Sequence, residues 1–331
     1  MWLSSSSVGR KFVMALTGAC LVLFVTFHCL MNAVAICWPT AYNAVCEFLG
    51  ANWYALIASA GLALLFIIHI IYAVMLTLQN RKARGTDRYS ISKKPATVEW
   101  SSQNMLVLGI VILAFLIVHL IQFWAKMQLV EVLGEHGAIP ATAGTLFIQE
   151  AFSCWLTPVI YIIGFIALWF HFNHGFWSMF QSIGWDNQVW ICRLKKISAW
   201  WTSIVVALFV IQAVVFTVNA NKDYYRTNDK LRAQYIEMAM PQIAATFGEQ
   251  AAAQLGSAPF DQMKQMVQGT LQQMEAPEAA SYFQNDAEFP KRLEALKNIN
   301  GLIEYLDAEA PAADEAPEAA EAPAQENPSN K

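Results

Sequence analysis

Residues 61–78 read GLALLFIIHIIYAVMLTL, a run with no charged side chain and with His69 in its interior. A transmembrane helix needs about 20 predominantly apolar residues, so this run predicts the central part of a membrane span. Four further runs of the same kind occur in the chain. The five predicted spans cover residues 12–36, 54–78, 105–124, 155–176 and 200–219. We therefore expect an all-α integral membrane protein built on a bundle of five transmembrane helices.

The composition supports this class of protein. Hydrophobic residues make up 56% of the 331 residues and charged residues only 14%, which is too apolar for a soluble domain of this length. The first run is longer than the apolar core of a signal peptide and has no clear small-residue cleavage site. We expect it to be retained as the first span.

The basic residues predict an orientation. The connection at residues 37–53 has no Lys or Arg, and the third connection has only Lys126. The basic residues gather before the first span and in the second and fourth connections: Arg10, Lys11, Arg81, Lys82, Arg84, Arg88, Lys93, Lys94, Arg193, Lys195 and Lys196. The positive-inside rule then places the N-terminus in the cytoplasm and the C-terminus in the periplasm. The expected location is the inner (cytoplasmic) membrane, crossed several times.

The chain changes character after residue 219. Residues 220–306 are polar with amphipathic stretches at 228–240 and 260–274, which predict a partly helical extracytoplasmic extension; continuation of the fifth span into it stays open. Residues 307–331 are rich in Ala, Glu and Pro and are expected to be disordered. The predicted domains are therefore 1–219, 220–306 and 307–331.

Four histidines lie inside four successive spans, where an imidazole must find a hydrogen-bond partner or bind a ligand. His28 and His119 fall in the outer halves of outward-running spans, and His69 and His171 in the inner halves of inward-running spans. Two facing pairs are what two bis-imidazole b-type haems require, because each iron takes two axial nitrogens. The alternative is that the histidines are bonded packing residues. Zinc is disfavoured because no cluster of ligands has suitable spacing.

Each of these spans also has a glycine seven to ten residues from its histidine, toward the other histidine pair: Gly18, Gly61, Gly109 and Gly164. The offset corresponds to about 10–15 Å along a helix. Each helix thus offers a ligand to one haem and a gap for the edge of the other. A single membrane glycine is more often a helix-packing residue.

Five segments carry a resemblance to a known family. They are SSSVGRKFVMALTG at 5–18, LFVTFHCL at 23–30, FIIHIIYAVMLTLQNRKARG at 66–85, LIVHLIQF at 116–123 and HFNHGFWSMFQSIGW at 171–185. In order and spacing they resemble the single-subunit, five-helix diheme cytochrome b anchor of succinate:quinone oxidoreductases, that is, succinate dehydrogenase and fumarate reductase. The resemblance covers residues 4–218. It implies that His28 and His119 ligate the distal haem and His69 and His171 the proximal haem.

The resemblance also selects between two neighbouring histidines. Family members have a histidine four residues before the glycine that corresponds to Gly175, followed by an aromatic-rich run ending in a pair like Gly184 and Trp185. This spacing favours His171 as the ligand and leaves His174 to bond a haem propionate or to face the headgroups. His136, in a polar loop, is expected to be solvated.

The resemblance implies partners as well. The chain has no dinucleotide fingerprint and no cysteine spacing for an iron–sulfur cluster, so a flavoprotein subunit would supply covalent FAD and an iron–sulfur subunit the clusters, without dicarboxylate catalysis on this chain. Electrons would pass between the iron–sulfur subunit and a membrane quinone, expected to be menaquinone. Residues 4–7 would face the iron–sulfur subunit. The direction of catalysis stays open, as does assembly into a dimer of heterotrimers. We expect membrane lipid as a partner and no nucleic acid.

Several other residues each allow two interpretations of their role. Arg10 and Lys11 are candidates for binding haem propionates, or serve only the positive-inside rule and lipid headgroups. Glu47 is a candidate proton-exchanging group at a quinone site, or a solvated loop carboxylate. Cys37 and Cys46 are able to pair or to stay free.

Two other classes of protein remain as alternatives. The anchor of a hydrogenase or formate dehydrogenase would share the four histidines but not the Ser-rich start or the HFNHG segment. A non-haem transporter would use intramembrane carboxylates or broken helices, and the five spans contain almost no acidic residue.

Overall fold

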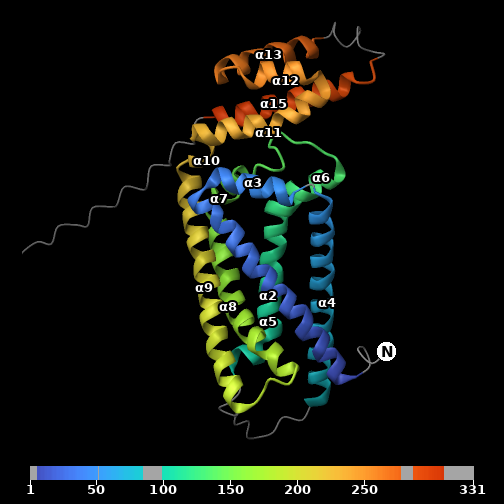
Figure 1. The fold of residues 1–331 in the computed structure, drawn as a ribbon, viewed down its shortest axis with the longest axis vertical. Helices are drawn as coiled ribbons and strands as arrows, with labels where there is room; N and C mark the ends of the chain where they lie inside the picture. Colours follow the sequence, from blue (N-terminus) through green and yellow to red (C-terminus); the bar gives the residue numbers. More distant parts are fainter. Residues whose placement is uncertain (1–5, 51, 85–98, 277–285, 309–331) are drawn as a thin grey trace, which may run out of the picture.

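The computed structural model describes residues 6–50, 52–84, 99–276 and 286–308, and the regular elements in these ranges are all helices (Figure 1). Five stretches are long and apolar enough to cross a membrane, which confirms the predicted class. They are α2 (Ser7–Cys37), α4 (Trp53–Arg84), α5 (Trp100–His119) continued by the π-helix η1 (Leu120–Leu129) and by α6 (Val130–Leu133), α8 (Leu156–Ser182), and α9 (Gln188–Asn221).

The helices extend beyond the predicted spans. Helix α9 begins at Gln188, well before residue 200, and Asn187 caps it by accepting a hydrogen bond from the backbone nitrogen of Trp190 at 3.0 Å. Its first turns contain Arg193, Lys195 and Lys196. Lys and Arg favour helices but not lipid. Hydrophobicity therefore predicts the part of a helix that lies in lipid and not the ends of the helix.

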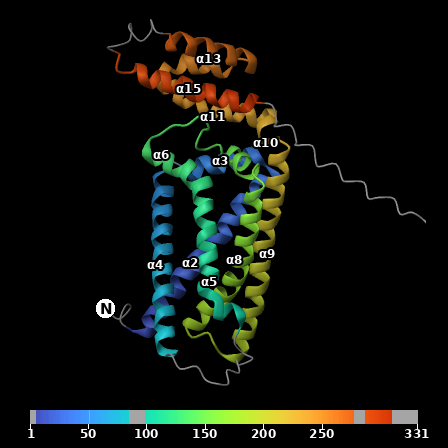
Figure 2. The same cartoon turned by 180° about the vertical axis from the view of Figure 1, so that it is seen from behind.

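Helix α2 crosses the bundle obliquely and packs on α4, α8 and α9, while α5 packs on α8 and α8 on α9 (Figures 1 and 2). Helix α4 lies against α2 and makes few contacts with α5. Exposed tryptophans lie at both ends of the bundle, for example Trp53 and Trp155 at one end and Trp100 and Trp185 at the other. Aromatic residues at both interfaces are typical of membrane helices.

Further helices cover one end of the bundle, which we call the capped end, at the top of Figure 1. Two of them, α3 (Pro39–Leu49) and α7 (Gly144–Phe152), lie in connections between spans, and α10 (Tyr224–Thr227) follows α9. Four more helices form what we call the C-terminal unit: α11 (Asp229–Phe247), α12 (Glu249–Gly256), α13 (Phe260–Glu275) and α15 (Phe289–Asp307).

The C-terminal unit differs in part from what the sequence predicted. Helix α9 stops at Asn221, and Asp223 has a left-handed φ of 51°, so the fifth span does not continue into the extension. The predicted helices at 228–240 and 260–274 are found within α11 and α13, whereas α12 and α15 were not predicted. Helix α15 includes Asp307, so the polar unit runs past the predicted limit of residue 306. The expected disorder of the tail concerns residues 309–331, which lie outside the described residues.

The hydrophobic core of the bundle continues into the C-terminal unit. Leu302 and Ile303 of α15 and Val267 of α13 are fully buried, and Ile243 of α11 is buried as well. Among the described residues after Tyr224, no large hydrophobic side chain is exposed. An apolar core beneath a polar surface is typical of a unit surrounded by water.

A buried ion pair joins the C-terminal unit to the bundle. The Arg226 guanidinium donates to the Asp223 carboxylate at 2.9 Å and to the backbone oxygen of Tyr305 in α15 at 3.2 Å. Gln149 of α7 donates to the same carboxylate at 3.1 Å. The turn after α9 is thereby fixed to both α7 and α15.

Candidate functional site

The four intramembrane histidines face one another in two pairs. Helices α2 and α5 run toward the capped end and bring His28 and His119 together, with ring centroids 5.7 Å apart and ring planes at 85°. Helices α4 and α8 run the other way and bring together His69 and His171, with centroids 6.4 Å apart at 63°. We call these the upper pair and the lower pair. Both pairings are those expected from depth along the sequence.

The spacing of each pair matches two imidazoles on one metal ion. A bond from a metal to an imidazole nitrogen is about 2 Å, and the ring centre lies about 1 Å beyond the nitrogen, so two rings on one ion have centroids about 6 Å apart. All four histidines are half-buried residues within the membrane spans.

His69 of the lower pair has its hydrogen bonding fixed by Thr17. The hydroxyl of Thr17 donates its single proton to the backbone oxygens of Val13 and Met14, at 2.9 and 3.1 Å. Its oxygen lies 3.1 Å from Nδ1 of His69. With the hydroxyl proton on the backbone, this oxygen accepts from Nδ1, which leaves the lone pair on Nε2. A metal-binding histidine typically has this arrangement.

His119 of the upper pair reaches the same state through Tyr161. The Tyr161 hydroxyl donates to Oε1 of Gln122 at 3.0 Å and lies 3.1 Å from Nδ1 of His119. Gln122 in turn donates to the Thr157 hydroxyl at 3.1 Å. With the hydroxyl proton of Tyr161 on Gln122, the phenol oxygen accepts from Nδ1 of His119, and Nε2 carries the lone pair.

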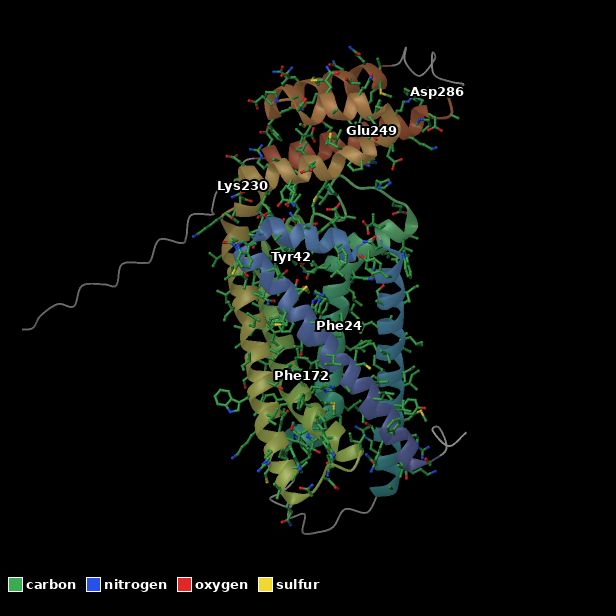
Figure 3. The ribbon with its side chains drawn as sticks, in the orientation of Figure 1. Phe24, Tyr42, Phe172, Lys230, Glu249 and Asp286 are labelled. Carbon is green, nitrogen blue, oxygen red and sulfur yellow. The ribbon has the colours of Figure 1, made fainter. Side chains whose placement is uncertain are left out.

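His28 is held by Asn32, one helical turn further along α2. The Asn32 amide nitrogen lies 2.9 Å from the backbone oxygen of His28 and 3.0 Å from its Nε2, while Oδ1 accepts from the Tyr42 hydroxyl at 2.9 Å. Because an amide nitrogen only donates, Nε2 of His28 must be the acceptor and hold the lone pair. Phe24 stacks on the same imidazole with centroids 5.5 Å apart, below Tyr42 in Figure 3.

His171 and His174 lie in different surroundings. His171 faces His69, and its buried Nδ1 lies near the backbone of Met105 without a hydrogen bond to any part of the chain that the structure describes. His174 instead lies 3.6 Å from a carboxylate oxygen of Glu99, whose other oxygen pairs with Lys195 at 2.6 Å. The structure thus places His171 in the lower pair. The surroundings of His174 are this ion pair, which the sequence did not predict.

The four glycines divide into three kinds. A Cβ at Gly18 would lie 3.7 Å from Cε1 of His69, and one at Gly109 would lie 3.8 Å from Cε1 of His171. These two glycines belong to the helices of the upper pair and lie beside the lower pair, as expected. A Cβ at Gly164 would lie only 2.5 Å from Cγ of Phe115, so this glycine serves helix packing, and a Cβ at Gly61 would meet nothing within 4 Å.

The remaining candidates are placed as follows. Arg10 is half-buried, and its Nε has no acceptor within the described ranges, whereas Lys11 is exposed. Glu47 is exposed on α3, which fits the interpretation as a solvated carboxylate.

His136 is exposed as expected. All six cysteines are free, including Cys37 and Cys46. Of the Ser-rich start, residues 4 and 5 lie outside the described residues, and Ser6 caps α2 by accepting from the backbone nitrogen of Gly9 at 2.9 Å.

Sequence reasoning missed the partners of the histidines. Thr17, Asn32 and Tyr161 contact ring nitrogens of the histidines, and Tyr42 and Gln122 contact Asn32 and Tyr161 in turn. None of these five residues was singled out. Asn32 had a signal, because residues four apart share a helix face. Gln122 belongs to the π-helix that begins directly after His119. Such π-segments are frequent at functional sites.

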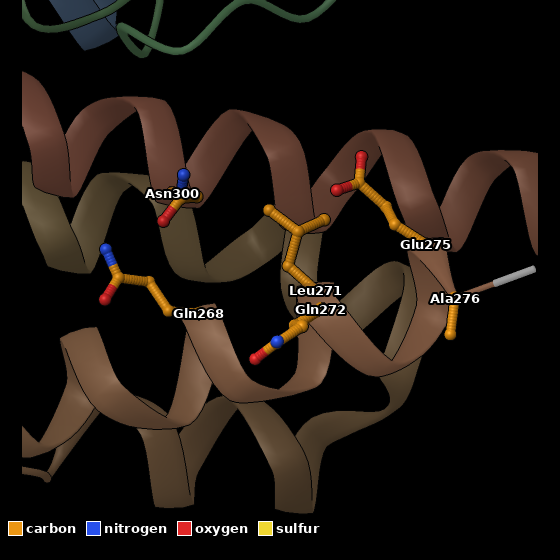
Figure 4. Close-up of a pocket in the computed structure, with 6 residues that line it drawn as sticks. All are labelled: Gln268, Leu271, Gln272, Glu275, Ala276 and Asn300. Carbon is orange, nitrogen blue, oxygen red and sulfur yellow. The ribbon is translucent and has the colours of Figure 1, made fainter.

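No cluster of three or more His, Cys, Asp or Glu side chains occurs in the described part of the chain. A bis-imidazole iron does not need one, since the macrocycle supplies its other ligands. A cavity of about 460 Å³ lies far from the histidines, in the C-terminal unit between α13 and α15 (Figure 4). It is lined by Gln268, Leu271, Gln272, Glu275, Ala276 and Asn300. These side chains carry no pair of groups suited to catalysis or metal binding.

Comparison with known families, curated proteins and solved structures found no match to this chain.

Proposed function

We propose that this chain is a diheme cytochrome b, the membrane anchor and electron-transfer subunit of a succinate dehydrogenase or fumarate reductase. The observation that carries the proposal is the pair of facing histidines at each of two depths, with centroids 5.7 and 6.4 Å apart. In each pair, one histidine has its Nδ1 on a hydroxyl group: His69 on Thr17 and His119 on Tyr161. With the proton on Nδ1, the free Nε2 is the nitrogen that binds a metal.

The residues present fit two haem groups. His28 and His119 would hold one iron, and His69 and His171 the other. Bound haem would supply one-electron transfer to the site. Gly18 and Gly109 each bring a residue without a side chain next to an imidazole of the lower pair, where a Cβ would lie 3.7 or 3.8 Å from the ring.

The assembly is part of the same proposal. A flavoprotein subunit with FAD and an iron–sulfur subunit would dock at the end of the bundle opposite the C-terminal unit, and a membrane quinone, menaquinone on the resemblance, would exchange electrons with the chain. This end would face the cytoplasm and the C-terminal unit the periplasm, as the basic residues predict. Half-buried Arg10, with a free Nε, is better placed than exposed Lys11 to bind a propionate.

The first test is the haem content of the purified chain, measured as pyridine haemochrome with reduced-minus-oxidised spectra. We expect two b haems in the wild type and the loss of a different one in His28→Ala and in His69→Ala. His174→Ala is the matched control, because this histidine lies on α8 within the same membrane span but outside both pairs; it should keep two haems. A wild-type chain without haem would refute the proposal and return the histidines to packing.

Co-purification then tests the partner enzyme. A flavoprotein with bound FAD supports the succinate dehydrogenase or fumarate reductase assignment. Nickel or molybdenum in the partner would instead identify the anchor of a hydrogenase or formate dehydrogenase. Either result leaves the haem assignment standing, since it depends only on the histidine pairs.

A further inference from the structure

A stack of aromatic rings is exposed at the turn between α8 and α9, at the end of the bundle opposite the C-terminal unit (Figure 1). Trp185 stacks on Phe180 with ring centroids 5.6 Å apart and planes at 10°, and Trp190 stacks on Trp185 at 5.8 Å and 18°. The Arg193 guanidinium lies 5.5 Å from the centre of the Trp190 ring. Four apolar side chains are exposed here and form what we call the turn patch: Ile183, Trp185, Val189 and Trp190.

Backbone hydrogen bonds fix the turn that presents these rings. The backbone nitrogen of Gly184 donates to the oxygen of Gln181 at 3.2 Å, and that of Trp185 donates to the oxygen of Phe180 at 3.0 Å. Together with the left-handed φ of 93° at Gly184, these bonds form a Schellman motif, which an apolar contact such as that of Phe180 with Trp185 frequently accompanies. The rings are thus held in one arrangement before any partner binds, which lowers the entropic cost of binding.

The length of α9 places the turn patch outside the lipid. The apolar part of α9, from Trp200 to Asn219, is about 29 Å long at 1.5 Å per residue and fills a hydrocarbon core of about 30 Å. Trp190 lies ten residues before Trp200 and therefore about 15 Å further out. The headgroup layer adds only about 5–8 Å on each side, and a usual helix tilt of about 20° shortens the 15 Å by only about 1 Å. We therefore expect the turn patch in water and the exposed Trp200 at the lipid boundary.

An apolar patch in water indicates contact with another protein. Trp185 and Trp190 are 53% and 44% exposed although each stacks on a neighbouring ring, so half of each indole remains open for a partner. Trp and Arg are the side chains most enriched where interfaces gain their binding energy. The stack ending in Arg193 supplies both.

The charges around the turn patch indicate what kind of protein fits. Residues 183–196 contain three basic residues and one acidic residue, Asp186. Arg193 and Lys196 are exposed, and neither meets a carboxylate in the part of the chain that the structure describes. A second copy of this surface would set basic residues against basic residues, and the connection at 85–98 also has three basic residues and only one acidic residue. The complementary surface is therefore acidic and belongs to a different protein.

We propose that the turn patch is the docking surface of a soluble partner subunit, which receives Trp185 and Trp190 in an apolar pocket bordered by carboxylates that pair with Arg193 and Lys196. The proposal rests on the proposed function, in which a soluble subunit docks at this end of the bundle, and it names the surface that holds that subunit. Because the turn projects past the headgroups, the partner reaches it without entering the lipid.

The test is the amount of soluble subunit that co-purifies with the full chain from solubilised membranes, measured per chain over a series of salt concentrations. Trp185→Ala/Trp190→Ala should retain at least about tenfold less subunit than the wild type. The matched control is Trp200→Ala, which removes an exposed tryptophan from the same helix at the lipid boundary and should retain the wild-type amount. The thermal midpoint should be equal in all three chains, since these side chains are exposed.

Reversal of the two charges tests the second part of the surface. Arg193→Glu/Lys196→Glu should release the subunit at lower salt than the wild type, because it sets carboxylates against carboxylates. Lys222→Glu/Lys230→Glu is the matched control, since it makes the same change at two exposed positions at the capped end. It should follow the wild-type salt dependence.

Photocrosslinking identifies what covers the patch. The photoreactive amino acid p-benzoylphenylalanine in place of Trp190, in the assembled complex, should give a product that joins this chain to the soluble subunit that co-purifies with it. A product with a second copy of the chain, with lipid or with residues 85–98 would overturn the inference.

The outcomes separate this inference from the proposed function. Loss of a soluble subunit without FAD from the patch variants would support the docking surface and contradict the succinate dehydrogenase or fumarate reductase assignment. Full retention of an FAD-containing partner in both patch variants, or equal loss in Trp200→Ala, would overturn the docking surface and leave the function intact. A wild type that retains no soluble subunit also overturns the docking surface, while its haem content decides the haem function separately.

Discussion

Gly164 offers a test of the packing that does not depend on any cofactor. Its ideal Cβ would lie 2.5 Å from Cγ, 2.8 Å from Cδ2 and 3.0 Å from Cβ of Phe115. Two of these three atoms lie at the base of the side chain, so rotation of the ring cannot relieve the contact. Helices α5 and α8 must move apart. Gly164→Ala is therefore expected to destabilise the bundle.

The size of the effect follows from two opposing contributions. Overpacking a tightly packed position costs about 1–3 kcal/mol, while replacing glycine by alanine within a helix gains about 1 kcal/mol. We expect a net loss of up to about 2 kcal/mol in the free energy of unfolding. Phe115 contacts Tyr161, with ring centroids 4.9 Å apart, and Tyr161 lies against His119. The displacement should therefore also reach the upper pair.

The assay is the thermal midpoint of the detergent-solubilised chain, followed by intrinsic tryptophan fluorescence. Gly61→Ala is the matched control, since it makes the same chemical change in a membrane helix where a Cβ would meet nothing within 4 Å. It should leave the midpoint unchanged or raise it. The double variant Gly164→Ala/Phe115→Leu should recover part of the lost stability, because the smaller side chain vacates space. Equal midpoints for Gly164→Ala and Gly61→Ala would refute the packing argument.

Two further predictions concern the C-terminal unit. Arg226→Ala leaves the buried Asp223 carboxylate without its cation, and breaking a buried ion pair costs about 3–5 kcal/mol of folding free energy. Limited proteolysis should then release α11–α15. The control Lys230→Ala, at an exposed position, should stay resistant. The hydrogen bond from Lys264 lowers the pKa of Asp307 below its ordinary 3.8 and raises that of Lys264. The pair therefore stabilises the fold while Asp307 is ionised and Lys264 is protonated, and this contribution is lost as the pH falls below about 3.8. The thermal midpoint should drop less on acidification in Asp307→Asn than in the wild type. Identical pH profiles of the two chains would contradict this linkage.

The membrane bundle could be predicted because its signals are local. Apolar runs reveal spans wherever they occur, and a histidine such as His69 is conspicuous because few polar residues interrupt them. The choice of His171 over His174 needed the family resemblance, and the structure agrees in pairing His171 with His69. Depth alone sorted the four histidines into pairs, since adjacent spans run in opposite directions.

The capped end could not be predicted in the same way. Helices α3 and α7 lie in short connections whose residues give no long periodic pattern, and α12 and α15 are held by contacts between distant segments. Asn43 and Thr145, for example, are buried together although 102 residues separate them. A π-helix such as η1 leaves no recognisable pattern in its residues either. These features depend on tertiary packing, which overrides local propensity.

The hydrogen-bond partners bear on the two interpretations of the histidines. Packing histidines in lipid would be expected to satisfy one another, and a direct bond between two imidazoles needs nitrogens about 2.9 Å apart and therefore centroids about 5 Å apart. The upper and lower pairs lie at 5.7 and 6.4 Å, and the described hydrogen bonds of the rings go to other side chains. The Thr17 hydroxyl and the Tyr161 phenol each lie on Nδ1 of their histidine and leave Nε2 open for a ligand, which is what the proposed haem function requires. The Asn32 amide instead donates to Nε2 of His28, so an iron bound there would displace it.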